Sequence, residues 1–190
     1  MNKLLVTIFL LLNVTLVYAQ TSDGVDVSID GLKKSLGVNM KFKIPEGWQE
    51  NQSRLPHVVK SFYNLDYALI FNIVIQEAPT FVSRNEFRNA MDKYHKQFDD
   101  MCRKDPSVLY YSELSYDVVT IDQYPFMATC VVDQRNYSDN RDSVMRYFTL
   151  YEDRFVTISF INHYIDVRLF QPVIDKIIKS IMFPDQYLTY

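Results

Sequence analysis

Apolar and polar residues alternate near the start of the chain in the way that a half-buried strand requires. Val38, Met40, Phe42 and Ile44 are apolar and are separated by single polar residues, which is the two-residue period of a strand. Residues 67–78 are nearly continuously apolar instead. Such a run is typical of a central strand that is covered on both faces. Both patterns predict a sheet.

A helix is predicted to begin at Ser83 and to stop at Asp105-Pro106. Ser83 and Glu86 have the spacing of a capping box, in which the serine hydroxyl accepts from the Glu86 amide while the glutamate reaches back. Proline excludes the helical conformation for the residue before it, which ends the helix. Six apolar residues recur at helical spacing and predict one buried stripe: Phe87, Ala90, Met91, Tyr94, Phe98 and Met101.

Shorter segments follow, separated by turns. Residues 108–121 alternate imperfectly, which predicts a bulged strand, and residues 122–125 and 151–154 are predicted turns. Pro172 fits the first turn of a last helix, where its missing donor costs nothing. That helix has an apolar stripe at Val173, Ile174, Ile177, Ile178 and Ile181. Further strands are expected at 58–63, 126–132, 144–150 and 155–161.

This order of elements predicts an α+β fold. Strands joined by short turns pair as an antiparallel β-sheet, and amphipathic helices cover the faces of such a sheet. Aromatic residues make up 15% of the chain, and they favour the half-buried surfaces of strands.

The first nineteen residues have the parts of a secretory signal peptide. Lys3 supplies the positive start, residues 4–12 are apolar apart from Thr7, and Ala19 completes a cleavage site before Gln20. The apolar run is shorter than the roughly 20 residues of a spanning helix. No cysteine lies near the cleavage site, which excludes lipoprotein attachment.

We therefore expect three regions and an exported product. Residues 1–19 are the signal peptide, 20–36 a flexible leader and 37–190 a single domain. The mature protein is expected to be periplasmic or secreted, with no membrane span after signal cleavage. The short signal favours a bacterial source.

The charge balance narrows the classes of partner. The chain has 20 basic and 23 acidic residues, a net charge of −3, and losing Lys3 with the signal leaves −4. A nucleic-acid or anionic-membrane partner requires a basic stripe, which this mildly acidic sequence lacks. We expect no nucleic acid partner.

Cys102 and Cys130 are the two cysteines, and two alternatives stay open for them. An oxidising compartment permits a disulfide between them. Two buried thiols that pack as small apolar groups account for them equally well.

The sequence contains no recognised catalytic or ligand-binding motif. His95 and Cys102 are seven residues apart on one predicted helix, which is about 10 Å along its axis and beyond hydrogen-bond reach. His57 and His163 have no ligand spacing with another histidine or cysteine. We predict no catalytic residue, no cofactor and no metal site.

The aromatic residues leave one binding hypothesis open. A stacking platform is one interpretation of five of them, since aromatic residues concentrate at binding surfaces. Core packing is the favoured interpretation, because the chain has twenty-eight aromatic residues to bury, and Trp48 follows a strand corner. The five are Trp48, Tyr110, Tyr111, Tyr116 and Tyr137.

The sequence resembles the Mog1/PsbP-like family in four places, which together cover about residues 37–183. They are the strand and Pro45-Glu46-Gly47-Trp48 corner of residues 37–48, the long helix after the apolar strand that ends at Ala78, the turn at 122–125, and the aromatic hairpin ending at 155–161 with the terminal helix residues 177–181.

The resemblance implies an α/β/α sandwich around an antiparallel sheet. Family members include extrinsic photosystem proteins, a nuclear-transport factor that binds a small GTPase, and bacterial exported proteins of unknown role. It implies no shared catalytic residues and favours non-enzymatic binding, although a shared fold is not a shared function.

The function expected first is an exported non-catalytic binding or accessory module that acts on a protein or cell-envelope component. One alternative is an exported hydrolase with a dispersed active site, which requires perturbed acids or a histidine in a deep pocket. The other is a carrier of a small apolar ligand, which requires an open apolar cavity.

Overall fold

A seven-stranded antiparallel sheet forms the centre of the molecule, in the computed structural model that describes residues 24–78, 83–136 and 138–187. The strand order is β3-β4-β5-β9-β8-β7-β6, and every neighbouring pair is antiparallel. The strands are β3 (Trp48–Glu50), β4 (Val58–Asn64), β5 (Leu69–Glu77), β6 (Val108–Ile121), β7 (Tyr124–Arg135), β8 (Asp142–Tyr151) and β9 (Arg154–Asn162).

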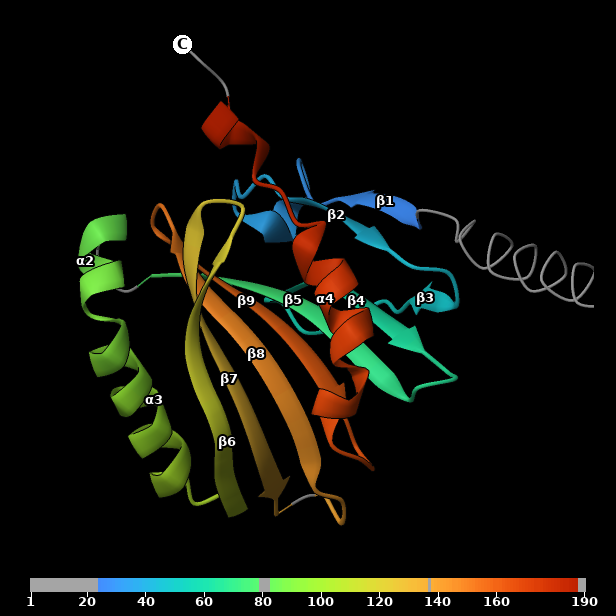
Figure 1. Ribbon diagram of the computed structural model, residues 1–190, viewed down its shortest axis with the longest axis vertical. Coiled ribbons are helices and arrows are strands. Elements are labelled where there is room, and N and C mark those ends of the chain that lie inside the picture. Colours follow the sequence, from blue (N-terminus) through green and yellow to red (C-terminus); the bar gives the residue numbers. More distant parts are fainter. Residues whose placement is uncertain (1–23, 79–82, 137, 188–190) are drawn as a thin grey trace, which may run out of the picture.

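Helices lie on both sides of this sheet. Figure 1 shows α2 (Arg84–Asn89) and α3 (Met91–Lys104) on one side and α4 (Gln171–Lys179) on the other. A small antiparallel sheet of β1 (Val25–Ser28) and β2 (Lys41–Ile44) lies on the α4 side. The predicted α+β fold, an antiparallel sheet covered by helices, is confirmed.

The main core fills the space between the large sheet and α4 with β2. Phe71 in β5 stacks on Phe160 in β9 at 4.9 Å between ring centroids, and it meets Phe42 of β2 edge-on at 5.5 Å. Ile174 and Ile177 of α4 are fully buried in the same cluster. The central position predicted for the apolar run at 67–78 is confirmed, because β5 pairs with β4 on one edge and β9 on the other.

A smaller core lies on the opposite face, where Phe87 and Met91 meet Met127 and Leu150. The capping box at Ser83 and Glu86 is confirmed. The predicted single helix is wrong in one respect, because it breaks at Ala90, which ends α2 and begins α3.

The buried face of α3 also corrects the predicted apolar stripe. Met101 was expected to be buried and is 60% exposed, whereas Cys102 is buried. Both belong to α3, where Cys102 lies about three turns after the buried Met91 and shares its face, whereas Met101 lies to one side of that face. A stripe extrapolated from Phe87 therefore fails at the far end of the helix.

The expected leader at 20–36 also needs correction where the structure describes it. β1 pairs with β2 in register from Val25 opposite Ile44 to Ser28 opposite Lys41. Ile29 is fully buried in the main core, and residues Lys33–Ser35 form a short 3-10 helix, η1. The described part of this segment therefore belongs to the domain. The signal peptide predicted at 1–19 lies outside the described residues.

The β6–β7 hairpin turns on only two residues, Asp122 and Gln123. Both have positive φ, 44° and 68°, which matches the right-handed twist of the paired strands but costs a non-glycine residue energy. The Asp122 carboxylate accepts from the backbone amide of Phe183 and from Gln186 Nε2, and so fixes the C-terminal segment. Within the described residues, no helix is long and apolar enough to cross a membrane.

Candidate functional site

Two of the three histidines, His95 and His163, tie elements together. His95 on α3 lies 2.6 Å from Glu113 of β6 through Nε2, and its ring stacks on Tyr116 at 3.8 Å. His163, just after β9, lies 2.7 Å from Asp142 of β8 through Nδ1. In the described part of the chain, no group of three or more histidine, cysteine, aspartate or glutamate side chains is placed to hold a metal ion.

Both cysteines are free and buried, which is the second of the two alternatives left open by the sequence. Cys130 points into the main core on the α4 side, where Asp166 and Arg168 are its charged neighbours. Cys102 lies on α3, where its charged neighbours include Arg146 and Asp133 of the opposite face. The possible disulfide is not formed, because the sheet stands between the two thiols. Burial raises the pKa of Cys130 to about 11.

Of the five aromatic residues considered as a stacking platform, the structure describes four, and these lie at the two opposite edges of the sheet: Trp48 on β3, and Tyr110, Tyr111 and Tyr116 on β6. Trp48 lies on β3 at one edge of the sheet and packs edge-on against Phe71 of the core, at 6.4 Å. Tyr116 lies on β6 at the opposite edge and is covered by the His95 ring.

The other aromatic candidates are covered by arginines. Arg141 lies over the Tyr110 ring at 4.1 Å, and Arg103 lies over the Tyr111 ring at 5.1 Å. Tyr137 lies outside the described residues. The four residues that the structure describes therefore do not form a single platform.

A buried carboxylate near α3 is held in an ion-pair network. Asp133 is 5% exposed, and burial raises its pKa above the ordinary carboxyl value. Its carboxylate lies 3.5 Å from Arg135, which also contacts Asp105 at the end of α3 at 2.7 Å. These ion pairs join β7 to the end of α3. The raised pKa of Asp133 is therefore explained by a structural role.

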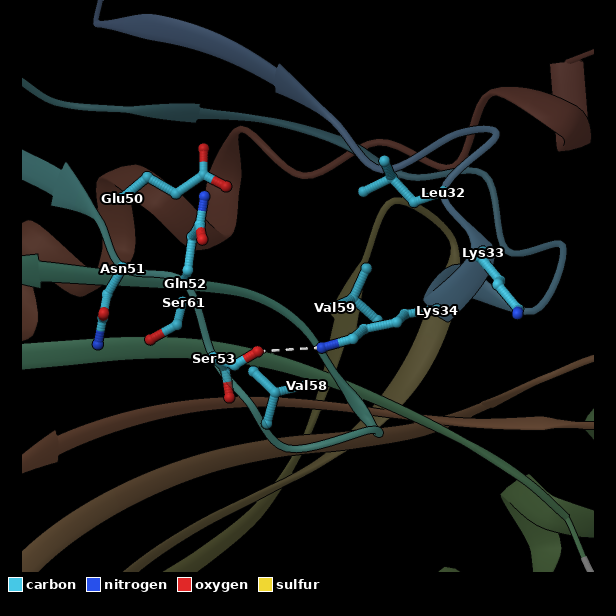
Figure 2. Close-up of a pocket in the computed structure, with 10 residues that line it drawn as sticks. All are labelled: Leu32, Lys33, Lys34, Glu50, Asn51, Gln52, Ser53, Val58, Val59 and Ser61. Atoms are coloured by element: carbon cyan, nitrogen blue, oxygen red, sulfur yellow. Dashed lines mark hydrogen bonds between the residues drawn. The ribbon is translucent and has the colours of Figure 1, made fainter.

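The structure has an open cleft of about 310 Å³ beside β3 and the start of β4. Figure 2 shows both polar and apolar side chains in its wall and Lys34 reaching across it. The Lys34 ammonium donates to the carbonyl oxygens of Ser53 and Leu55, at 3.1 and 2.9 Å. The lysine thus fixes the loop after β3. The lining also includes Lys33, Glu50, Asn51, Gln52 and Ser61.

The most distinctive surface lies at the end of the sheet where β4 and β9 finish. Five large apolar or aromatic side chains are exposed there, between 40 and 73%. They come from the β4–β5 turn and from the segment that follows β9 and continues into η2 (Val167–Phe170), which lie at the same end of the sheet in Figure 1. We call these residues the loop surface: Leu65, Tyr67, Tyr164, Ile165 and Leu169.

Two buried asparagines fix the backbone of the loop surface. Asn162 is fully buried at the end of β9, and its Oδ1 accepts from the amides of Tyr164 and Ile165 at 2.8 and 2.9 Å. Asn64 is 2% exposed at the end of β4, and its Oδ1 accepts from the Tyr67 amide at 3.0 Å. These are Asx-type turns, in which the side chain takes over a backbone hydrogen bond.

The two loops are also bonded to each other. Asn162 Nδ2 donates to the Tyr67 carbonyl at 2.9 Å, and the Tyr67 ring contacts Phe170 at 5.6 Å between centroids. Beyond them, the Val167 amide donates to the buried hydroxyl of Ser143 at 3.0 Å. The backbone that carries the exposed side chains is therefore held at several points.

One ion pair lies beside the loop surface. Asp166 accepts from the Arg168 amide at 2.9 Å and pairs with its guanidinium at 2.6 Å. Hydrogen bonds from Arg168 hold the pKa of Asp166 below its ordinary value. Leu169 follows this pair and is 71% exposed.

The loop surface was not predicted from the sequence, although a signal was present. Asn64-Leu65-Asp66-Tyr67 and Asn162-His163-Tyr164-Ile165 both place an asparagine at the end of an apolar strand, followed by apolar residues inside a turn. Turns favour polar residues. Apolar residues held in two such turns mark an exposed surface, but only the tertiary structure shows that the two turns adjoin.

No family model matches the sequence, and no curated protein matches it either. Solved structures do match. The solution structure of CyanoP, the cyanobacterial PsbP of Synechocystis, has a TM-score of 0.55 at 13% identity, covering 83% of this chain and 92% of that one. LpqN of Mycobacterium tuberculosis, described as involved in cell envelope biogenesis, has a TM-score of 0.52 at 8% identity, covering 83% and 90%.

A third similar structure is the Ran-binding protein Mog1p of Saccharomyces cerevisiae. Its TM-score is 0.50 at 9% identity, with 88% of this chain and all of that one covered. At these identities the likeness shows the fold alone, and the chain has a Mog1/PsbP-like fold.

Proposed function

We propose that this Mog1/PsbP-like domain is an exported accessory module that binds a protein partner through the loop surface and has no catalytic activity of its own. The observation that carries the proposal is the pairing of highly exposed apolar side chains with a fixed backbone. Tyr164 is 73% exposed, yet its amide is bonded to the fully buried Asn162. Exposed apolar side chains that gather in one place mark interaction sites.

The exposure of these side chains favours a macromolecule over a small molecule. Small-ligand sites are concave and bury most of the ligand. Leu65 and Leu169 are 65 and 71% exposed, so they stand out from the surface instead of lining a cavity. The cleft in Figure 2 lies elsewhere, beside β3, is open, and has the charged side chains of Lys33, Lys34 and Glu50 in its lining. A carrier of an apolar ligand therefore has less support.

The fixed backbone favours specific binding. Association is weakened by the ordering of loops and side chains, so a surface that is ordered beforehand binds more tightly. Tyrosines contribute strongly at protein interfaces because a large ring is immobilised at little entropic cost. Tyr67 and Tyr164 are both placed in this way.

The structural neighbours support an accessory role without specifying it. Mog1p is a Ran-binding protein, and LpqN is described as involved in cell envelope biogenesis. The signal peptide predicted at 1–19 supports export, and the acidic balance of the chain supports a protein partner over a nucleic acid. We therefore place the partner in the cell envelope or outside the cell.

A capture experiment with matched variants tests the proposal. Purified mature protein, the double variant Tyr164→Ser with Leu169→Ser, and the control Leu55→Ser are each immobilised and exposed to envelope extract. Leu55 is also exposed, at 55%, but lies by the cleft. We expect the native protein and the control to retain the same partner, and the double variant to lose at least about tenfold of it.

Capture of a protein does not by itself support the proposal, because the proposal requires that the capture depend on the loop surface. Equal capture by all three proteins would contradict it, provided circular dichroism shows the same fold. Turnover of ester, peptide or glycoside substrates above a heat-inactivated control would contradict the non-catalytic part.

A further inference from the structure

β6 is a fourteen-residue strand that pairs on one edge only. It is the last strand of the large sheet and bonds to β7, and no strand among residues 24–78, 83–136 and 138–187 lies beside its other edge. Leu109, Leu114 and Val118 are exposed along it, at 65, 37 and 45%. Free edges of this length are sites where another chain can add a strand.

The pairing with β7 identifies which residues direct their backbone groups outward. Ile121 and Tyr124 close the two-residue hairpin, so they are a hydrogen-bonded pair. The next pair, Thr120 and Pro125, must then be a non-bonded one. Two observations agree: proline has no amide hydrogen, and the Pro125 carbonyl accepts from Thr149 of β8 at 2.6 Å.

Alternation then assigns Tyr116, Val118 and Thr120 to the free edge. A separate contact supports this. The Val118 amide donates to the carboxylate of its neighbour Asp117 at 2.7 Å and so is not used by β7. The carboxylate oxygen occupies the place where a carbonyl oxygen of an added strand would lie.

The outer part of β6 is regular and lacks the residues that normally protect an edge. Register shifts interrupt its pairing between Val108 and Tyr110 and between Glu113 and Ser115. From Ser115 to Ile121 the register runs without a break. Sheet edges are usually protected by lysine, proline or bulges. Residues 108–121 contain no lysine, arginine or proline.

We propose that the Ser115–Ile121 edge of β6 binds an extended, basic segment of a partner protein by strand addition. The added strand bonds to the outward groups of Tyr116, Val118 and Thr120. Asp117 leaves the Val118 amide, which then donates to a partner carbonyl. The released carboxylate pairs with a lysine or arginine of the partner.

Charge argues for a basic segment rather than a second copy of this chain. Glu113 and Asp117 are the only charged residues of β6. Glu113 already bonds His95, whereas Asp117 is exposed and bonds only its neighbouring amide among the contacts described. Two β6 strands would bring acidic residues together with no basic residue on either, and such like-charge neighbours destabilise a sheet.

Amide hydrogen exchange with two synthetic peptides tests this proposal. The probe is a capped eight-residue peptide of alternating lysine and valine, and its matched control alternates glutamate and valine. We expect the lysine peptide to slow exchange at Tyr116, Val118 and Thr120 at least about fivefold more than the glutamate peptide. Equal slowing by both peptides, or none, would overturn the proposal.

Proline and charge variants separate the edge from the fold. Val118→Pro removes an outward amide, which an edge strand tolerates, and is expected to weaken lysine-peptide binding about tenfold. Val119→Pro removes an amide bonded to β7 and should instead lower thermal stability.

Asp117→Asn should weaken binding about fivefold and reduce its salt dependence. Unchanged affinity in Val118→Pro, with the native circular dichroism spectrum, rejects the site.

Binding of the lysine peptide also distinguishes the proposed edge site from the loop surface of the proposed function. The variant Tyr164→Ser with Leu169→Ser should bind the lysine peptide as the native protein does, because the loop surface is built by β4, β9 and η2. Loss of peptide binding in that variant would refute a separate edge site. A dimer that Val118→Pro dissociates would also refute it, in favour of a second copy.

Discussion

Asn162 donates from its side-chain amide to the carbonyl oxygen of Tyr67, at 2.9 Å. This single bond joins two turns that are ninety-five residues apart in the sequence. The same side chain accepts from the amides of Tyr164 and Ile165. One buried asparagine therefore sets the relative position of most of the loop surface.

Replacing Asn162 with alanine is expected to lower the free energy of unfolding by about 3 kcal/mol. Three hydrogen bonds are lost, each worth about 1 kcal/mol, and buried backbone groups are left without partners. Urea denaturation measures the change. The matched variant Tyr164→Ser removes an exposed side chain and should stay within about 0.5 kcal/mol of native. Equal losses in both would contradict the role given to Asn162.

The two cysteines are expected to titrate as free thiols. Denatured protein that has not been reduced should react with two equivalents of a thiol reagent. The folded protein should react far more slowly, because burial raises the pKa of both thiols and leaves little thiolate at pH 8. A denatured sample without free thiols would show a disulfide and overturn this structure at Cys102 and Cys130.

The substitution Gln123→Gly is expected to stabilise the protein by about 1 kcal/mol. Gln123 has a φ of 68°, in the left-handed region that costs a non-glycine residue about that much. Asp122→Gly relieves the same kind of strain but removes the acceptor for Phe183 and Gln186, so it should destabilise instead. Thermal unfolding of both variants provides the measurement, and a gain in Asp122→Gly would contradict this account.

The capping box at α2 supplies a prediction for stability at neutral pH. Ser83 Oγ accepts from the Glu86 amide at 3.2 Å, and the Glu86 carboxylate accepts from the Ser83 amide at 2.8 Å. Ser83→Ala should cost about 1 kcal/mol. Ser83→Asp keeps an N-cap acceptor and should retain most of the stability, as chemical denaturation can show.

The same box predicts a pH dependence with a definite sign. Hydrogen bonds from Ser83 lower the pKa of Glu86 relative to the unfolded chain. A lowered carboxyl pKa stabilises the fold above the ordinary value and stops doing so as the pH falls through the lowered one. The stability difference between native protein and Glu86→Gln should therefore shrink below about pH 4. A difference that grows in acid would have the wrong sign.

Local patterns were enough for most of the elements. The Ser83 capping box and the Asp105-Pro106 stop predicted both ends of the helical region, because caps depend on neighbouring residues only. The imperfect alternation at 108–121 predicted a bulged β6, and two register shifts are found there. The helix break at Ala90 was not predicted, since apolar spacing alone does not show where a second helix restarts.

The candidate sites needed contacts between distant residues. Cys102 and Cys130 lie on neighbouring elements, yet the direction in which Cys130 points depends on the pairing of β7 with β6 and β8. The loop surface likewise depends on the adjacency of β4, β5 and β9.

By itself the sequence determined the predicted export signal, the antiparallel α+β architecture and the positions of most turns, because these follow from short-range periodicity, capping and turn chemistry. Only the tertiary structure decided that the two thiols are apart, that β1 belongs to the domain and that Leu65, Tyr67, Tyr164, Ile165 and Leu169 form one surface. Those outcomes depend on strand order and register, which bring together residues that no local pattern relates.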